Sequence, residues 1–227
     1  MSTYITGDTH RDFNRIFDFC EENGTSCDDI MIILGDAGIN YYLDQSDADL
    51  KEYLGTCPIT LLCIHGNHEE RPFMIDSYKE TEWHGGTVYY EEAYPNLLFA
   101  KDGEIYDFDG KKAVVIGGAY SVDQFTRDIW FDTEQPTEEI KAYVEGQLER
   151  AGFQVDYVFS HTAPKQYEPT WAFTPGRDQS LVDKSTEEWL DSIERRLNYE
   201  CWYCGHFHVD DQEGPVRIMY EEVDELW

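Results

Sequence analysis

The sequence predicts an α/β fold in which strands are covered by helices. Short apolar runs alternate along the chain with stretches whose apolar residues recur at helical spacing. The 41% hydrophobic and 15% aromatic fractions are sufficient for a packed core. Because no linker-like segment or charge block divides the 227 residues, we expect one domain over 1–227.

Eight short apolar runs are expected to form strands, since they have the length and composition of buried strands. They span 3–6, 30–34, 59–64, 87–90, 112–116, 155–160, 199–203 and 216–220.

Three segments are expected to form helices. Apolar residues recur at helical spacing from Phe13 to Cys20, and Asp12 is placed to cap that helix. The other two helices are expected over 137–151 and 185–197.

The charge of the chain limits its partners. Forty-seven acidic and 17 basic residues give a formal charge of -30. Such a field repels polyanions and cannot supply the many cationic contacts that nucleic-acid binding needs, so long DNA or RNA is disfavoured. A small phosphorylated substrate remains compatible, because a bound metal can supply local positive charge.

Cysteine usage and the N-terminal sequence predict a cytoplasmic protein. The six cysteines lack dense disulfide spacing, and "MSTYITGDTH" is not a basic segment followed by an apolar one. No apolar run approaches the roughly 20 residues that cross a bilayer, so no membrane segment is expected. Cys201 and Cys204 form a CxxC pair without a second one, and we expect buried reduced thiols rather than a redox or zinc pair.

Residues of the metal-binding type follow five of the predicted strands directly. In open α/β sheets ligands bind beyond the carboxyl ends of strands, so these five endings can converge on one site. The residues are Asp8, His10, Asp36, Asn67, His68, His161, His206 and His208.

These side chains form a donor set that predicts a metal site. Carboxylates, an amide and five imidazoles suit manganese, iron or zinc, and include too many nitrogens for calcium or magnesium. Eight groups exceed the needs of one four-coordinate zinc, so two metals sharing a carboxylate fit better. Asp36, at the mouth of an apolar strand, would be that carboxylate, because two cations offset the cost of burying its charge.

The ordered series GDTH, GD, GNHE, SHTAP and GHFH resembles the calcineurin-like metallophosphoesterases. Their signature is D-x-H, G-D, G-N-H-D/E, H and G-H-x-H in that order, and the resemblance runs from Asp8 to His208. It implies a four-layer α/β/β/α sandwich with two divalent metal ions. Manganese is the first choice, and iron, zinc and nickel are alternatives.

The resemblance also implies a role for each matching residue. Asp8, His10 and His208 would hold one metal, and Asn67, His161 and His206 the other. Asp36 would bridge them, so that two cations generate a hydroxide from a bridging water. His68 would act as the general acid at the leaving-group oxygen.

One block departs from a branch of the family. The protein serine/threonine phosphatases have G-D-x-x-D-R-G, whereas this chain has "GDAGINYY" without that aspartate or arginine. Phosphoprotein phosphatase activity is therefore disfavoured. We expect Asn40 to take over the orienting role of the missing aspartate.

Four residues beside the motifs are expected to contact substrate. Arg71, two residues after "NHE", is the first choice for a phosphate clamp, because a guanidinium matches phosphate oxygens. Its alternative is an ion pair with one of the many carboxylates. The other three are Arg11, Tyr120 and Arg127.

Two further segments are expected around the site. The segment 117–131 resembles the loop that overhangs the active site in these enzymes, and the proline-containing segment 163–180 is a candidate lid.

The leading hypothesis is a metal-dependent phosphoesterase acting on a small phosphodiester, nucleotide-derived or otherwise, or on a phosphomonoester. One alternative is a nuclease on short oligonucleotides. The other is a catalytically silent binding scaffold of the same fold, which is disfavoured because His68 and all seven candidate ligands are in place.

Overall fold

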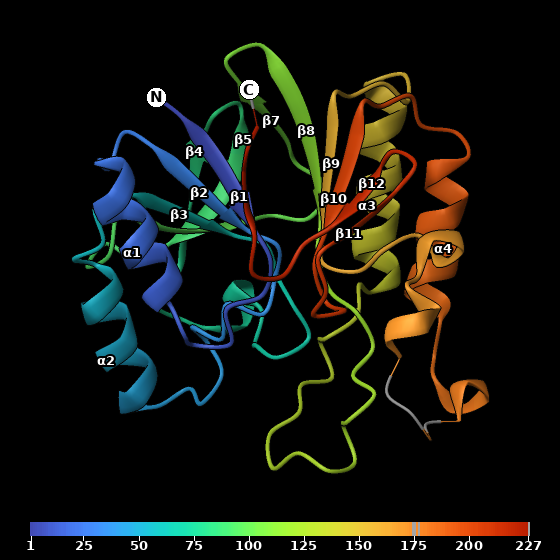
Figure 1. Ribbon diagram of the computed structural model, residues 1–227, viewed down its shortest axis with the longest axis horizontal. Coiled ribbons are helices and arrows are strands. Elements are labelled where there is room, and N and C mark those ends of the chain that lie inside the picture. The colour runs from blue at the N-terminus through green and yellow to red at the C-terminus, as the bar shows by residue number, and fades with distance from the viewer. Residues whose placement is uncertain (174–175, 177, 227) are drawn as a thin grey trace.

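Two β-sheets stacked face to face form the centre of the protein, with helices on both outer faces (Figure 1). The computed structural model describes residues 1–173, 176 and 178–226. It confirms the α/β class and the four-layer α/β/β/α arrangement that the resemblance implied.

Thirteen strands form the two sheets within the described residues. The first sheet has the order β13-β1-β2-β3-β6-β5-β4, and the second has the order β11-β12-β10-β9-β8-β7. The first sheet contains β1 (Thr3–Thr6), β2 (Ile30–Ile33), β3 (Thr60–Cys63), β4 (Lys79–Trp83), β5 (Gly86–Tyr90), β6 (Leu97–Ala100) and β13 (Val223–Glu225). The second contains β7 (Ile105–Phe108), β8 (Lys111–Ile116), β9 (Tyr157–Ser160), β10 (Cys201–Cys204), β11 (Asp211–Glu213) and β12 (Val216–Ile218).

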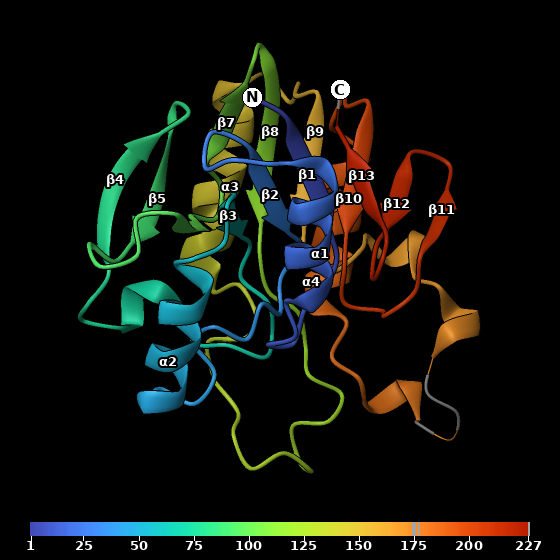
Figure 2. The ribbon, with the colours of Figure 1, turned by 60° about the vertical axis from the view of Figure 1, so that its left-hand side comes forward.

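The helices divide between the two outer faces (Figures 1 and 2). α1 (Asn14–Asn23) and α2 (Gln45–Leu54) cover the first sheet, and α3 (Glu138–Arg150) and α4 (Ser185–Glu194) cover the second. Short 3₁₀ helices are η1 (Pro72–Met74), η2 (Lys165–Tyr167), η3 (Thr170–Ala172) and η4 (Gln179–Leu181).

Three apolar layers hold the sandwich together, and β2 shows how one strand serves two of them. Ile30 and Ile32 face the second sheet, while Met31 and Ile33 pack in the cluster that includes Phe13 of the α1 region. This alternation follows from the two-residue repeat of a strand. A third cluster joins the outer face of the second sheet to α3 and α4.

Parallel pairing decides where the strands end. β1, β2, β3 and β6 run parallel in the first sheet, and β8, β9, β10 and β12 run parallel in the second. Their carboxyl ends therefore lie at one edge of each sheet. In Figure 1 the loops that follow them meet below the centre of the sandwich.

Sequence patterns did not predict one helix and five strands of the structure. The helix is α2, and the strands are β4, β6, β7, β11 and β13. Two of these, β4 and β11, lie at sheet edges and consist mostly of exposed polar residues, so neither has an apolar run to reveal it.

The start of one helix differs from the prediction. Thr137 caps α3 at the start of the expected helix, accepting a hydrogen bond from the Ile140 amide. In contrast, Phe13 occupies the N-cap of α1, and Asp12 accepts from the Asn14 amide in the preceding turn.

The CxxC pair lies on opposite faces of β10. Cys201 packs at the edge of the core between the sheets, whereas Cys204 belongs to the layer under α3 and α4. Both are free thiols. Residues three apart on a strand point in opposite directions, so the two sulfur atoms cannot bind one metal.

The helices within the described residues are all too short or too polar to cross a membrane.

The core between the sheets gives a stability prediction. Phe159 is fully buried in it, and Phe159→Ala is expected to lower the free energy of unfolding by about 3 to 5 kcal/mol through the cavity that it leaves. Phe125→Ala is the matched control, because Phe125 is 87% exposed. Urea denaturation measures both, and equal losses would contradict this account of the core.

Candidate metal centre

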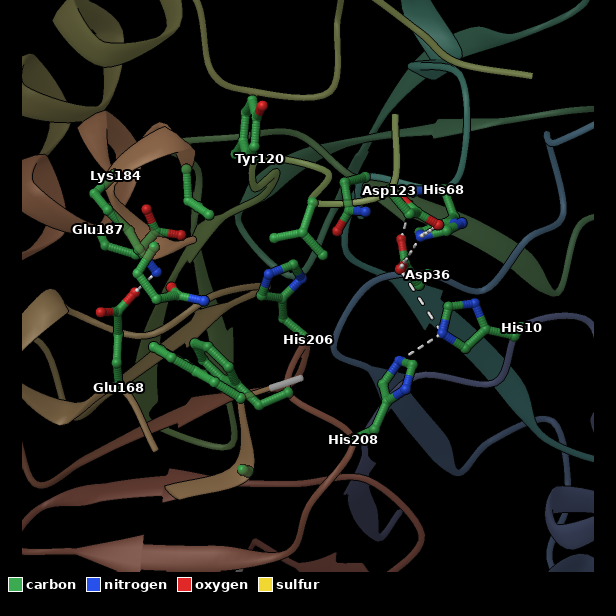
Figure 3. A pocket seen from close by; sticks show the side chains of 17 residues that line it. His10, Asp36, His68, Tyr120, Asp123, Glu168, Lys184, Glu187, His206 and His208 are labelled. Atoms are coloured by element: carbon green, nitrogen blue, oxygen red, sulfur yellow. Dashed lines mark hydrogen bonds and ion pairs between the residues drawn. The ribbon is translucent and has the colours of Figure 1, made fainter. Parts of the chain in front are cut away.

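The loops after five parallel strands bring all eight sequence-predicted metal and acid residues to one place. Asp8 and His10 follow β1, Asp36 follows β2, and Asn67 and His68 follow β3. His161 follows β9, and His206 and His208 follow β10, so both sheets contribute. Figure 3 shows His10, Asp36, His68, His206 and His208 around one cavity.

Asp8, His10 and His208 form a first cluster. Nε2 of His208 lies 3.3 Å from Asp8 Oδ2, and Nε2 of His10 lies 3.7 Å from the same oxygen. The two imidazole Nε2 atoms are 2.8 Å apart. These three side chains have ligand atoms close enough to share one ion.

Asp36 lies between this cluster and a second group. Its Oδ2 is 3.9 Å from Nε2 of His10, and its Oδ1 is 3.6 Å from Nε2 of His161. The ring of His206 stands 5.0 Å from that of His161, centroid to centroid. Asp36 thus occupies the position expected of a shared ligand.

The hydrogen bonds of His161 test whether this group fits a cation. Nδ1 lies 2.7 Å from the carbonyl oxygen of Leu34, which can only accept, so Nδ1 carries the proton. In the neutral ring Nε2 then bears a lone pair, and it lies 2.9 Å from Oδ1 of Asn67. Asn67 directs its Nδ2 to Ser121 Oγ at 2.9 Å, and that oxygen also accepts from Arg127. Lone pairs of His161, Asn67 and Asp36 therefore converge, which fits a bound cation.

The buried carboxylates give a second test of fit. Asp8 and Asp36 are each 1% exposed, and Asp8 Oδ2 has no hydrogen-bond partner within the described part of the chain. Among the described residues, no lysine or arginine forms an ion pair with either carboxylate. Burying such charges is expensive unless a cation meets them. The donor set suits a divalent ion of the manganese, iron or zinc type.

The protonation states of these groups suit metal ligands. Burial acts to raise the pKa of Asp8, but the close imidazole of His208 and two further histidines outweigh it and lower that pKa. For Asp36, His161 and His68 likewise overcome burial and lower its pKa. Burial, with the neighbouring His161, lowers the pKa of His206 to about 3. At neutral pH the carboxylates are therefore ionised and His206 is neutral, as ligation requires.

The backbone at the strand ends is adapted to aim these side chains. His10, Asp36, His206 and His208 have φ values of 45°, 48°, 72° and 53°. Residues other than glycine rarely adopt this left-handed region, and such conformations gather at functional sites.

Two motif glycines allow the carboxylates to pack closely. A Cβ on Gly66 would lie 2.0 Å from Oδ1 of Asp36, and a Cβ on Gly205 would lie 2.3 Å from Oδ1 of Asp8. Any side chain at either position would displace the carboxylate of the neighbouring strand end. Close packing against the two carboxylates therefore explains why glycine stands at these positions of "GN" and "GH".

His68 has an acidic neighbour that sequence reasoning missed. Its Nε2 lies 4.0 Å from Oδ2 of Asp36 and 3.9 Å from Oδ2 of Asp123, which comes from the loop after β8. Burial lowers the pKa of His68, while Asp36 and Asp123 oppose that shift. Asn40, which was expected to orient the site, is buried and accepts a hydrogen bond from Tyr78. The one sequence feature that pointed to Asp123 was its place in the segment 117–131, which was expected to overhang the active site.

Two of the predicted substrate contacts do not line the metal cavity. Arg71 is 2% exposed and forms a buried ion pair with Asp102, away from the metal cavity. Arg11 pairs with Asp47 and donates to the carbonyl of Gly38, and it does not line the cavity either. In so acidic a chain, nearby carboxylates and carbonyls compete for these guanidinium groups.

The other two predicted contacts lie at or beside the cavity. Tyr120 lines it. Arg127 lies behind it, donating to Ser121 Oγ at 2.6 Å, and that oxygen also accepts from Asn67. Arg127 therefore supports a candidate ligand.

Both predicted surrounding segments reach the cavity. From 117–131, Tyr120, Val122 and Asp123 line it, and from 163–180 the lining includes Phe173 and Gln179. Residues 174, 175 and 177 of the predicted lid lie outside the described residues.

Glu69, the last residue of "GNHE", joins two of the motif loops. Its carboxylate accepts from the Gly66 amide and from the Gly38 amide, each at 3.1 Å. It is fully buried, and burial together with the Asp36 carboxylate raises its pKa to about 8. Glu69 thus holds the loop that carries Asp36 against the loop that carries Asn67.

Removing the two hydrogen bonds of Glu69 should destabilise the protein. Glu69→Ala leaves two buried amides without an acceptor, which is expected to lower the free energy of unfolding by roughly 2 to 4 kcal/mol. Chemical denaturation at a fixed metal concentration checks this. The control is Glu92→Ala, because the Glu92 side chain is 70% exposed and pairs with Lys79 at the surface. A loss no larger than that of the control would refute the role.

Comparison with known proteins agrees with this architecture. The sequence model of the calcineurin-like phosphoesterase family matches residues 1–210 of this chain. The crystal structure of TT1561 of Thermus thermophilus aligns with a TM-score of 0.53 at 11% identity, over 99% of this chain and 98% of that chain. A Staphylococcus aureus protein described as a candidate 5′-nucleotidase, in complex with alpha-ketoglutarate, aligns with a TM-score of 0.50 at 15% identity, over 96% of this chain and 48% of that chain. At these identities the two structures bear on the fold alone. A search of curated proteins gave no match.

Proposed function

Because the chain belongs to the calcineurin-like phosphoesterase family, we propose that it is a two-metal phosphoesterase that hydrolyses a small phosphodiester or, alternatively, a phosphomonoester. The observation that carries this proposal is the convergence of the lone pairs of Asp36, Asn67 and His161 beside the cluster of Asp8, His10 and His208. Donors so arranged around a cavity suit a phosphoryl group bound to cations.

The proposed ligands divide into two sets that share one carboxylate. Asp8, His10 and His208 would hold one ion; Asn67, His161 and His206 would hold the other; and Asp36 would serve both. Manganese is the first candidate, and iron, zinc and nickel have suitable donors in the same set. When bound, the ions would activate water and neutralise the phosphoryl oxygens.

The chain's own residues would orient the reaction. His68 lines the cavity but is not needed to complete either ligand set, so it can donate a proton to the departing oxygen as the general acid. Asp123 would position the His68 ring and help it to retain that proton, because a nearby carboxylate favours the imidazolium. Tyr120 would contact the organic part of the substrate.

We also propose that the family domain extends from the matched residues to the end of the chain at 227. β12 and β13 lie beyond residue 210, yet each completes one of the two sheets. β13 pairs with β1 in antiparallel register, Tyr4 opposite Glu225.

Metal content tests the shared carboxylate. Asp36→Asn is expected to lower the bound manganese from about two ions per chain to one or fewer, because the amide cannot offer two anionic oxygens. Elemental analysis after dialysis against manganese measures this. Asp49→Asn is the control, since Asp49 is exposed on α2. Two retained ions in Asp36→Asn would exclude the proposed bridge.

Hydrolysis tests the proposed chemistry. Metal-stripped protein reloaded with manganese should cleave bis-p-nitrophenyl phosphate faster than p-nitrophenyl phosphate, because the singly charged diester is repelled less by this acidic chain than the doubly charged monoester. His68→Ala should lower kcat by about 10²-fold or more for a diester with an alkoxide leaving group, such as a nucleoside 2′,3′-cyclic monophosphate, through loss of the general acid. The loss should be smaller for bis-p-nitrophenyl phosphate, because p-nitrophenolate leaves without a proton. His84→Ala is the control, because His84 lies in the turn between β4 and β5. If folded, metal-loaded protein cleaves neither ester, the proposal of a general phosphoesterase fails.

A further inference from the structure

The cavity extends well past the candidate metal centre. Its volume is about 350 Å³, within the range of pockets that bind small organic ligands. Figure 3 shows Asp36 and His68 on one side of His206 and a second polar group on the other. That group consists of Glu168, Lys184 and Glu187, and we call this end of the cavity the distal end.

An aromatic strip connects the two ends. The ring of His206 lies 5.1 Å from that of Phe207, the residue between the two histidines of "GHFH". Phe207 stacks on Phe173 with centroids 6.3 Å apart and planes 23° apart. The ammonium group of Lys184 then lies 4.7 Å from the centre of the Phe173 ring. A flat organic group attached to a phosphoryl group at the metal end could lie along this strip.

Glu187 places a buried carboxyl group at the distal end, with no role in the candidate metal centre. It stands in the first turn of α4, lines the cavity and is only 3% exposed. Its Oε1 accepts from the Thr162 hydroxyl at 3.0 Å, but its Oε2 has no hydrogen-bond partner among the residues that the structure describes. Burial raises the pKa of this carboxyl to about 7. A buried acceptor without a donor costs free energy, which a ligand that supplies N–H groups would recover.

The charge of the distal end restricts what can bind there. Lys184 is the one cation among the described residues that line the cavity, and it is paired with Glu168 at 2.6 Å. With Glu187 ionised, these three groups have a net charge of -1. A second phosphate or a carboxylate on the organic group would be repelled. A neutral ring that carries hydrogen-bond donors is the complementary ligand.

We infer that the distal end is a base-recognition subsite for a nucleoside phosphoester, in which Glu187 accepts the imino and amino N–H groups of the base. This inference rests on the proposed phosphoesterase function and names its substrate class. The base would lie along Phe207 and Phe173, because aromatic side chains stack on bases. Glu187 is therefore assigned as a residue that determines specificity.

The chemistry of a carboxylate predicts an order among the bases. Guanine presents adjacent N1–H and N2–H donors that match both oxygens of Glu187. Adenine and cytosine present one amino group beside a ring-nitrogen acceptor, and uracil presents an imino N–H between two carbonyls. We therefore expect guanine to be favoured over adenine and cytosine, and uracil to be the poorest.

The four nucleoside 2′,3′-cyclic monophosphates provide a matched series, since only the base differs. With manganese-loaded full-length protein, kcat/KM for the guanine compound should exceed that for the uracil compound by about tenfold or more, the range of one good bidentate pair. In Glu187→Gln the preference should move from guanine towards adenine, because an amide offers one donor and one acceptor. A purely structural role for Glu187 would lower all four values together.

Glu188→Gln is the matched control. Glu188 neighbours Glu187 on α4, but its side chain is 59% exposed and pairs with Lys165. This variant should keep the base preference of the unmodified protein. An equal change of preference in both variants would overturn the assignment to Glu187.

Binding of the four free nucleosides, measured by saturation-transfer NMR, separates this inference from the proposed function. If bis-p-nitrophenyl phosphate is cleaved but the four cyclic nucleotides react alike, the base subsite is wrong and the phosphoesterase stands. If no ester is cleaved, the proposed function fails, and nucleoside binding then decides the subsite. Selective guanosine binding that Glu187→Gln abolishes would support the subsite, and unselective binding or none would overturn it.

Discussion

The burial of two carboxylates, Asp8 and Asp36, at the edge where both sheets end is the constraint on which the site depends. Their charges meet imidazoles rather than lysine or arginine within the described residues. The surrounding structure is organised around holding them there. Gly66 and Gly205 provide the space, left-handed backbone conformations orient the candidate ligands, and Glu69 joins two of the loops. A divalent cation would convert this costly arrangement into a stable one.

The two ends of the cavity are built by different means. Strand ends of both sheets supply the metal end, and their positions are set by parallel pairing and by the apolar layers. The distal end is built from α4 and from the segment after β9, which lie outside the sheets. Loops and helix termini can vary without disturbing a sheet, so such elements are suited to determine specificity while the strand ends provide the chemistry.

Competition for charge explains why two of the predicted substrate contacts do not line the cavity. In a chain with 47 acidic and 17 basic residues, a guanidinium group near a motif has many carboxylates within reach. Asp102 pairs with Arg71 and Asp47 pairs with Arg11, so neither side chain faces the cavity. The acidic neighbour of His68 was not predicted because it is distant in the sequence. Asp123 lies 55 positions further along the chain, and only the folded loop after β8 brings it near.

Local sequence patterns were enough to predict the α/β class, the family and the eight residues that the strand ends bring together. Apolar runs reveal strands, and the eight residues follow five of these runs closely. Contacts between distant segments were needed to show that Asp36 lies between the two groups of candidate ligands and that Nε2 of His161 faces Asn67. The tertiary structure also decided that Arg71 is buried while Glu187 lines the cavity. These outcomes depend on contacts between distant segments, and the energy of a buried charge depends on every group that surrounds it, whatever its position in the chain.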